Sequence, residues 1–407
     1  MLSWPGDRIL DFRAFSFRHV SSDNAHLSIG RTTGRSPTVS NMMRLWQFVG
    51  LGLLLSGSAL AAKFTPLETH TNDTIFFSYA QSPDGQWIAG GSQARRDAAN
   101  TNQPPSGGSV ILWRTQDGHR ESVLGDHAAT VNWMQFSEDS KTLVSGSGTS
   151  GLLKVWSIPD RSLRYTLRLQ EPLIASSTLG SQLVCALSPD GKRLAAAGAV
   201  VKPVGISQTS EAATLMVWDL TTGRVLWTLP QCGVGTLAFT PDGQALLAYT
   251  RKIVWEELRG FHSARIADER LMSWNATNGA TNFMSPIPGM NPSHLVVSAK
   301  SGAVLALSGD RNTWYDLKTG SVSREQPIQL RRSLHVAAMN RDEDQLLVID
   351  FSAENMHRVR IADGVTSIAG SFKGHTNRVM FAAVSIDLKR IAGTRSNRPV
   401  IVDLEAP

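Results

Sequence analysis

A short turn phrase that recurs about every fifty residues constrains the fold of this chain more than any other feature. Its three clear copies read Ser-Pro-Asp-Gly or Thr-Pro-Asp-Gly and begin at Ser82, Ser188 and Thr240. Proline fixes the first corner of a turn, aspartate bonds the nearby backbone and glycine accepts a positive φ, so each copy predicts a tight turn between two strands. Weaker copies begin at positions 137, 299, 340 and 385. The chain is therefore expected to contain seven repeats of one small unit.

A second phrase, an apolar strand ending in tryptophan, follows most of these turns and is itself followed by another turn and a short strand. Each repeat thus predicts four antiparallel strands, and so small a sheet buries both faces only by packing against its neighbours around an axis. We predict an all-β seven-bladed β-propeller of four-stranded antiparallel blades. The last repeat, 378–404, supplies only three strands, and the segment 64–68 is expected to add the fourth and close the ring.

The repeats resemble those of the WD40 family. The resemblance rests on Trp218-Asp219, on Gly125-Asp126-His127, on Gly374-His375 and on the repeated tryptophans. It covers residues 63–407 and implies a WD40-like propeller of a bacterial exported type. Few repeats carry both signatures, so the buried polar network of the family is expected in few blades. The resemblance implies structural roles for Trp113, His127, Trp156, Trp218, Asp219, Trp274, Trp314 and His375.

The first 62 residues read as a leader and not as part of the propeller. An apolar run at 45–55 follows Met42, Met43 and Arg44 and ends in small residues, which is typical of a secretory signal. The run is shorter than the ~20 apolar residues of a membrane span. We expect a signal peptide at 42–62, cleaved after Ala61 or Ala62, and a disordered leader at 1–41 that is either an over-called start or part of a bipartite targeting leader. The alternative is an uncleaved anchor helix. Cleavage predicts a periplasmic or secreted protein with no stable membrane span.

The charge of the chain gives little support to a nucleic-acid partner. The formal net charge is +6, but residues 1–62 hold six arginines and three aspartates, and the remainder has a net charge of +3. No basic stripe with interleaved aromatic residues is present, so nucleic-acid binding is not expected. The segment 146–151 has the glycine spacing of a dinucleotide fingerprint, but a predicted strand follows it where that motif needs a helix. We interpret it as a turn and expect no cofactor.

The distances of two histidines and two cysteines from their turn phrases give two further predictions. His294 and His335 each precede their turn phrase by five residues, which makes them weak candidates for a metal or proton site in the central channel; the alternative is two solvated residues. Cys185 and Cys232 lie three and eight residues before their turn phrases. That offset corresponds to roughly 16 Å along neighbouring strands, too far for a disulfide, so two free and buried thiols are predicted.

Insertions mark the expected binding side of the ring. The connection between the second and third strands is lengthened near 93–106, 200–213 and 251–270, and these connections are expected to emerge on one face. Arginine mixed with large aromatic residues is typical of an interface hot spot. The alternative is that the tryptophan of the third insertion packs onto its own blade. The candidate partner-binding residues are Arg95, Arg96, Arg251, Lys252, Trp255, Arg259, Phe261, His262 and Arg265.

These observations predict a non-catalytic scaffold that binds protein partners, with no catalytic residue. One alternative is a periplasmic propeller enzyme, either a metal-dependent hydrolase or lactonase or a quinoprotein-like protein. The segment 219–227 resembles the docking motif of quinoprotein propellers, but it occurs cleanly only once. A subunit of an envelope complex is a third possibility.

Overall fold

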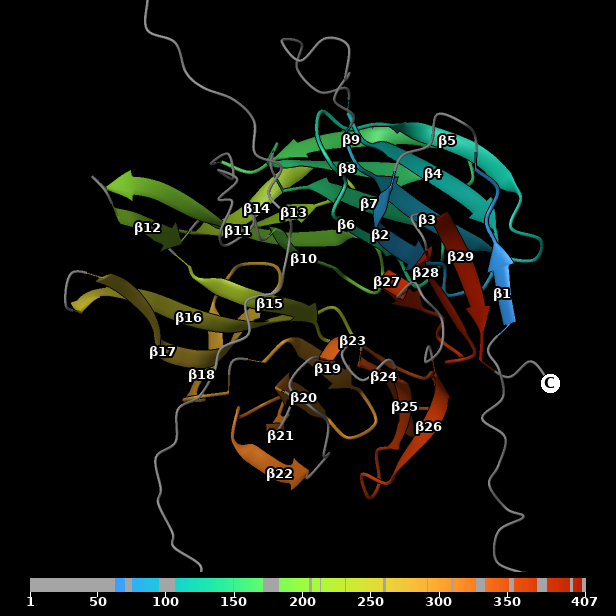
Figure 1. Ribbon diagram of the computed structural model, residues 1–407. Coiled ribbons are helices and arrows are strands. Elements are labelled where there is room, and N and C mark those ends of the chain that lie inside the picture. Colours follow the sequence, from blue (N-terminus) through green and yellow to red (C-terminus); the bar gives the residue numbers. More distant parts are fainter. Residues whose placement is uncertain are drawn as a thin grey trace, which may run out of the picture. The chain divides into compact units, whose positions relative to one another are not determined.

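The computed structural model (Figure 1) describes the backbone between residues 63 and 404. Within this range the undescribed residues are 70–74, 95–106, 149, 171–182, 205–206, 213, 231, 259–260, 291, 309–310, 327–333, 351–354, 372–378 and 396–397. Backbone alone is described at 63, 199–204, 207–212, 253–258, 261–267, 311, 325–326, 334–337, 350, 355, 371 and 379–382. The predicted leader and signal peptide, 1–62, lie outside the described residues.

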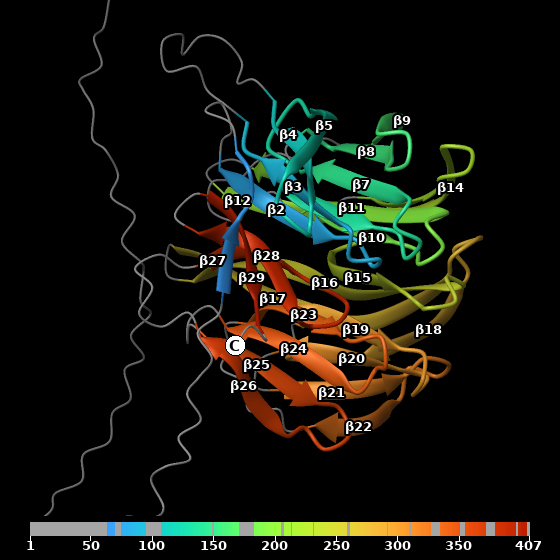
Figure 2. The same ribbon diagram turned by 90° about the vertical axis from the view of Figure 1, so that its right-hand side faces the viewer.

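Seven antiparallel sheets form a ring, and the described residues contain no helix (Figures 1 and 2). Blade 1 consists of β2 (Phe76–Gln81), β3 (Trp87–Ser92), β4 (Ser109–Arg114) and β5 (Arg120–Asp126). Blade 2 consists of β6 (Trp133–Phe136), β7 (Thr142–Ser147), β8 (Leu152–Ser157) and β9 (Ser162–Arg168). Blade 3 consists of β10 (Leu183–Leu187), β11 (Arg193–Val204), β13 (Leu215–Asp219) and β14 (Arg224–Leu229), with β12 (Ser207–Ala212) paired to β11.

The other four blades repeat this order, and the first strand of each blade lies nearest the centre of the ring (Figure 1). Blade 4 consists of β15 (Val234–Phe239), β16 (Ala245–Leu258), β17 (Phe261–Asn275) and β18 (Thr281–Pro286). Blade 5 consists of β19 (His294–Ser298), β20 (Ala303–Ser308), β21 (Arg311–Asp316) and β22 (Val322–Gln326). Blade 6 consists of β23 (Leu334–Met339), β24 (Gln345–Asp350), β25 (Asn355–Arg360) and β26 (Thr366–Ser371). Blade 7 consists of β27 (Val379–Val384), β28 (Arg390–Arg395), β29 (Arg398–Asp403) and β1 (Lys63–Pro66).

The seven predicted turns, including the weak copies, each contain one residue in the left-handed backbone region. The fourth residue of every turn has a positive φ between 54° and 73°, whether or not it is glycine. In five of the turns the first residue donates its hydroxyl to the aspartate two positions later, at 2.5–2.6 Å. Hydrogen bonds from Thr240 and from the Gln244 N–H lower the pKa of the Asp242 carboxyl. The residues with positive φ are Gly85, Ser140, Gly191, Gly243, Gly302, Glu343 and Leu388.

The ring closes as predicted, with the two ends of the propeller in one sheet. β1 pairs antiparallel with β29, from Lys63 opposite Asp403 to Pro66 opposite Val400. Across the same seam the Tyr79 hydroxyl lies 2.6 Å from Thr394 Oγ1, and Thr394 Oγ1 donates to the Phe76 carbonyl at 3.2 Å. The ladder therefore holds the N-terminal strand in blade 7, and the buried hydroxyl pair joins blade 1 to blade 7.

The two hydroxyl groups at this seam are expected to contribute unequally to the free energy of unfolding. Tyr79→Phe leaves Thr394 bonded to a backbone carbonyl, so we expect a loss of about 1 kcal/mol in the free energy of unfolding. Thr394→Val leaves the buried Tyr79 hydroxyl without that partner, for which roughly 2–3 kcal/mol is expected. Urea unfolding of both variants measures the difference. Losses near zero for both variants would show that the seam does not depend on the hydroxyl pair.

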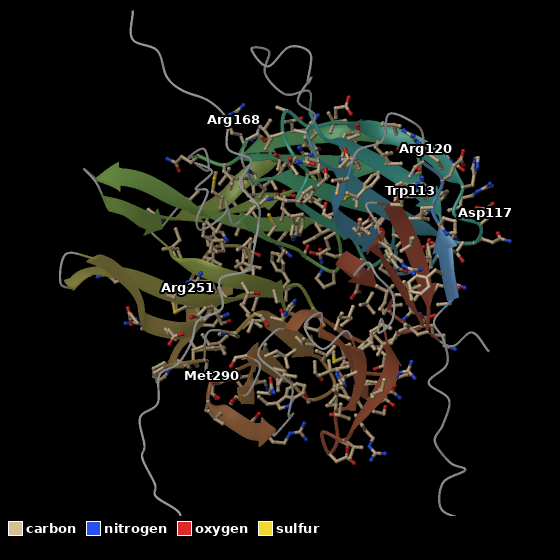
Figure 3. All side chains as sticks on the ribbon, viewed as in Figure 1. Trp113, Asp117, Arg120, Arg168, Arg251 and Met290 are labelled. Atoms are coloured by element: carbon tan, nitrogen blue, oxygen red, sulfur yellow. The ribbon has the colours of Figure 1, made fainter. Side chains whose placement is uncertain are left out.

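The hydrophobic core is divided into seven clusters, one at each blade junction. Trp113, Trp156, Trp218 and Trp274 are at most 2% exposed and pack toward the preceding blade. Figure 3 shows Trp113 within the side chains of blade 1. Cys185 and Cys232 are buried in two different clusters and form no disulfide, which confirms the prediction of two free thiols.

Trp314 departs from the tryptophan register expected from the sequence. Tyr315 occupies the equivalent position and packs toward blade 4, whereas Trp314 packs toward blade 6. The repeat phrase of blade 5 is thus shifted by one residue, and a one-residue shift in a strand moves a side chain to the other face. Arg324 lies over the Trp314 ring at 5.5 Å and donates to the Ile361 carbonyl of blade 6 at 2.9 Å. The shifted tryptophan is therefore part of the junction between blades 5 and 6.

The outermost strands contact the next blade through the turn between its third and fourth strands. Trp227 of β14 donates its indole N–H to the Ala276 carbonyl of blade 4 at 3.0 Å, beside Gly279. Tyr165 of β9 makes the same kind of contact with blade 3, donating to the Thr221 carbonyl at 3.0 Å beside Gly223. These turns have positive φ at glycine, and a Cβ there would meet the aromatic ring.

Candidate functional site

Two long β-hairpins extend past the ring at blades 3 and 4 (Figure 1). Beyond the four-stranded sheet, β11 continues through residues 199–204 and pairs with β12. β16 and β17 likewise continue together from Lys252 opposite Ala267 to Leu258 opposite Phe261. The sequence predicted insertions at both places, and the structure shows that both are strand extensions.

The hairpin of blade 4 has a structured base. An extra residue in β17 shifts the register between Thr250 and Lys252, and Asp268 at this bulge has φ 52°. The Tyr249 hydroxyl is fully buried and donates to Glu269 Oε1 at 2.6 Å, while the second oxygen of Glu269 accepts the Gly289 N–H. Burial, followed by the hydrogen bond to Glu269, raises the pKa of Tyr249 far above its ordinary value. The hairpin thus leaves the ring from a fixed point, marked by Arg251 in Figure 3.

The structure places most of the predicted partner-binding residues in this hairpin. Lys252, Trp255, Phe261, His262 and Arg265 all belong to the extended β16–β17 ladder. In the register, Trp255 is opposite Ala264 and His262 is opposite Glu257. Three other candidates, Arg95, Arg96 and Arg259, lie outside the described residues.

The two candidate channel histidines lie in the first strands of neighbouring blades. His294 begins β19, and its Nδ1 lies 3.0 Å from Ser293 Oγ. His335 lies in β23, in the neighbouring blade, where only its backbone is described. By strand register Asn132 of blade 2 matches His335 and not His294, which lies one residue further along its strand, and Asn132 accepts the Gly148 N–H at 3.0 Å. Within the described part of the chain, no group of three or more His, Cys, Asp or Glu side chains could hold a metal.

On the face that carries the seven turns, a pocket of about 450 Å³ lies where blades 1, 6 and 7 meet. Its walls are turn residues, among them Asp84, Arg341 and Asp387. Asp84 and Asp387 each accept hydrogen bonds from their own turn, so these carboxylates stabilise the turns that carry them.

Within the described part of the chain there is no helix with the length and hydropathy that a membrane span requires.

Blade 2 contains a buried polar network. His127 is 2% exposed, its Nε2 lies 2.7 Å from Ser145 Oγ, and Trp156 donates its indole N–H to the same oxygen at 2.8 Å. Burial, with the positive charge of Lys154 as a second cause, lowers the pKa of His127 to about 3. Among the described residues, His127 Nδ1 is buried and has no hydrogen-bond partner.

The network needs a hydroxyl that the other blades do not have. By strand register, the position of Ser145 is occupied in the other blades by Gly90, Ala196, Ala248, Ala306, Val348 and Gly393. None of these side chains can accept a hydrogen bond from an indole. This confirms the expectation that few blades complete the network. His375, the other predicted histidine, lies outside the described residues. Asp219 instead stabilises its own turn, accepting the Thr221 N–H at 2.7 Å.

The family model for the WD domain, G-beta repeat, matches residues 118–157, which span the network of blade 2. The chain is a seven-bladed β-propeller that carries a match to the WD40 repeat at this place. The propeller can be compared with the β-propeller domain of Cps50 (Swd1) from Myceliophteria thermophila, with a TM-score of 0.56 and 14% identity, over 84% of this chain and 99% of that one. At this identity the likeness shows the fold alone.

Three of the curated relatives each match part of this chain. Transducin beta-like protein 3 of Rattus norvegicus is 24% identical over 47% of this chain and 23% of its own length. An uncharacterized WD repeat-containing protein of Synechocystis is 30% identical over 29% of this chain and 28% of its own. Mitochondrial division protein 1 of Saccharomyces cerevisiae is 26% identical over 30% of this chain and 16% of its own. The matches thus cover 16–28% of the length of these relatives.

Proposed function

We propose that this propeller is a non-catalytic scaffold and that a protein partner docks on the face that carries the hairpins of blades 3 and 4. The observation that carries the proposal is the pair of neighbouring hairpins, each extended beyond the sheet that its blade needs. Isolated two-stranded ribbons are marginally stable in water, so such extensions suit a surface that gains contacts from a partner. A WD40-type fold is consistent with this role because its rigid ring presents connections from several blades side by side.

The ladder of blade 4 supplies the residue types of an interface. Trp255, Phe261 and Arg265 lie within it, and aromatic residues and arginine are enriched where binding energy is concentrated. Lys252 and His262 add charge and hydrogen-bonding capacity. The register brings these residues into one ribbon, which favours a single docking surface over scattered contacts.

Shortening each hairpin at a defined rung tests the proposal. In the first variant, residues 253–266 are replaced by Asn-Gly, a two-residue turn that closes the Lys252–Ala267 pair and keeps the contact between Tyr249 and Glu269. In the second variant, 201–210 are replaced by Asn-Gly next to the Val200–Glu211 pair, which removes the blade 3 hairpin and measures its separate contribution to docking.

The readout is photocrosslinking in cells from position 255, with position 368 on the outer rim as the control site, where Ile368 is 62% exposed. We expect one discrete adduct from position 255 and none from position 368, and we expect the first variant to lose co-purification of the same partner. An unchanged yield of that partner from the variant lacking 253–266 would rule out the hairpin as its docking site.

We also propose that the propeller is exported, to the periplasm or outside the cell, after cleavage near Ala62. The pattern of residues 42–62 supports this, and β1 begins at Lys63. Cleavage after Ala62 would therefore leave all four strands of blade 7 in the mature chain. Mass spectrometry of the N-terminal peptide of the native protein is expected to show a start at Ala62 or Lys63. A mature chain that retains residues 1–62 would contradict the proposal.

A further inference from the structure

Asn278 and Gly279 form the only Asn-Gly pair in the sequence. They lie in the turn between β17 and β18 of blade 4, where Gly279 has a φ of 73° and the Asn278 side chain is exposed. A backbone nitrogen can attack the side-chain amide of the asparagine before it, and the reaction is easiest at glycine, which has no Cβ to obstruct the approach. The sequence of this turn therefore favours a spontaneous chemical change.

In the folded turn both reacting groups have other partners. The Gly279 N–H donates to the Asn275 carbonyl at 2.9 Å, and Asn278 Oδ1 accepts the Ala280 N–H at 3.0 Å. The attack requires the Gly279 nitrogen to lose its proton and to approach Asn278 Cγ, so the bond to the Asn275 carbonyl has to break first. The folded turn thus opposes the reaction that its sequence favours.

Blade 3 holds this turn closed. The Trp227 ring packs on Gly279, where a Cβ would lie 2.9 Å from it. The same side chain donates its indole N–H to the Ala276 carbonyl at 3.0 Å, and Arg193 donates to Thr277 Oγ1 at 3.3 Å. Opening of the turn therefore requires the contact between blades 3 and 4 to loosen.

We propose that Asn278 is a deamidation site that the contact between blades 3 and 4 protects. When the turn opens, the Gly279 nitrogen bonds to Asn278 Cγ and the Cγ–Nδ2 bond breaks, so a succinimide forms and ammonia leaves with the proton from Gly279. Water then opens the succinimide to aspartate or to isoaspartate, in which the backbone runs through the side chain and is one methylene group longer. The inference goes beyond the proposed function, because it concerns a covalent change in the chain and needs no partner.

The five Asp-Gly pairs of the chain have the same positive φ at glycine but are expected to react more slowly. An ionised carboxylate is a poor electrophile, and hydrogen bonds to it stabilise the ionised form. The hydrogen bond from Thr240 lowers the pKa of Asp242. The hydrogen bond from Arg360 lowers the pKa of Asp363. Asn278 carries a neutral amide and is therefore the reactive member of this set.

Conversion of Asn278 acts at the junction between the two blades that carry the long hairpins. Either product adds a negative charge to the turn, and isoaspartate also lengthens the backbone between Asn275 and Ala280. The bond from the Gly279 N–H to the Asn275 carbonyl then no longer fits the turn. Converted protein, separated by ion exchange, is thus expected to unfold at a lower urea concentration than unconverted protein.

Peptide mapping by mass spectrometry, after incubation of the full-length protein in mildly alkaline buffer, measures the rate of conversion. In the folded wild type we expect a rate at least roughly tenfold lower than in the same chain unfolded in guanidinium chloride. Trp227→Leu removes the ring and the indole donor, so the folded rate is expected to rise about fivefold, the change that one lost hydrogen bond makes to an opening equilibrium.

Tyr165→Leu is the matched control. It removes the same kind of contact, with Gly223 between blades 2 and 3, and leaves the turn at Asn278 in place. The rate at Asn278 is expected to stay at the wild-type value. Equal acceleration by Tyr165→Leu would assign the reaction to unfolding of the whole ring and would overturn the proposal. So would equal rates in the folded and unfolded wild type, or conversion of an Asp-Gly pair ahead of Asn278.

Discussion

A Gly279→Ala variant is expected to lose far more stability than Gly85→Ala, although the two glycines have the same φ of 73°. An alanine in the left-handed region costs about 1–2 kcal/mol at either site. At Gly85 a Cβ meets nothing within 4 Å, whereas at Gly279 it lies 2.9 Å from the Trp227 ring. Displacing that ring breaks the bond from Trp227 to the Ala276 carbonyl, so roughly 1–3 kcal/mol more is expected at Gly279.

Equilibrium unfolding in urea measures both losses, and a double-mutant cycle identifies the cause. Trp227→Leu in the Gly279→Ala background removes the ring that the new methyl group meets, so part of the added loss is expected to be recovered. Equal losses at positions 85 and 279 would show that backbone strain alone decides the effect. The contact between blades 3 and 4 would then be less rigid than the structure indicates.

The stability of the propeller is expected to fall as the pH is lowered from about 6.5, because His127 remains neutral when folded. Its pKa is lowered to about 3, mainly by burial, whereas an exposed histidine titrates near 6.5. Between these values the unfolded chain binds a proton that the folded chain does not, so this contribution is complete above pH 6.5 and is lost toward pH 3. From pH 7 to pH 4 the loss is roughly 3 kcal/mol.

Two variants separate titration from hydrogen bonding in this network. His127→Gln removes the titrating group, so its deficit relative to the wild type is expected to narrow as the pH falls from 7 to 4. Ser145→Ala removes the hydroxyl that Trp156 and His127 share but keeps the histidine, so its deficit should stay nearly constant. Thermal unfolding at pH 7, 5.5 and 4 provides the comparison. Parallel pH profiles for the wild type and His127→Gln would mean that His127 is accessible to protons in the folded state.

The fold prediction rested mainly on the recurring turn phrase. The phrase beginning at Ser385 has no glycine, yet Leu388 adopts the same left-handed conformation as Gly85 because the surrounding strands impose it. The spacing of the phrases therefore fixed the blade count and the place where the ring closes. It did not reveal the shift at Trp314, because a strand that ends in Trp-Tyr offers two aromatic residues and their order does not show which one faces the preceding blade.

The sequence predicted where the candidate site lies in the chain, but it did not predict that the site is a β-hairpin. Residues 251–258 mix charged and apolar types without strict alternation, so they read as a loop, although the ladder with 261–267 is regular. The contacts between Trp227 and Gly279 and between Tyr165 and Gly223 were not predicted either. Each joins residues that lie about one repeat apart, and turn signals carry no information about which side chain of the previous blade approaches them.

Closure through β1 and β29 has a consequence for synthesis. Lys63–Pro66 is the first strand of the propeller to be made, and its partner Arg398–Asp403 is the last. A nascent chain can build six sheets while its leading strand has nothing to pair with. A chain that stops before Arg398 would thus have an open seam and two unsatisfied strand edges, so the loss of this one strand would affect the whole ring.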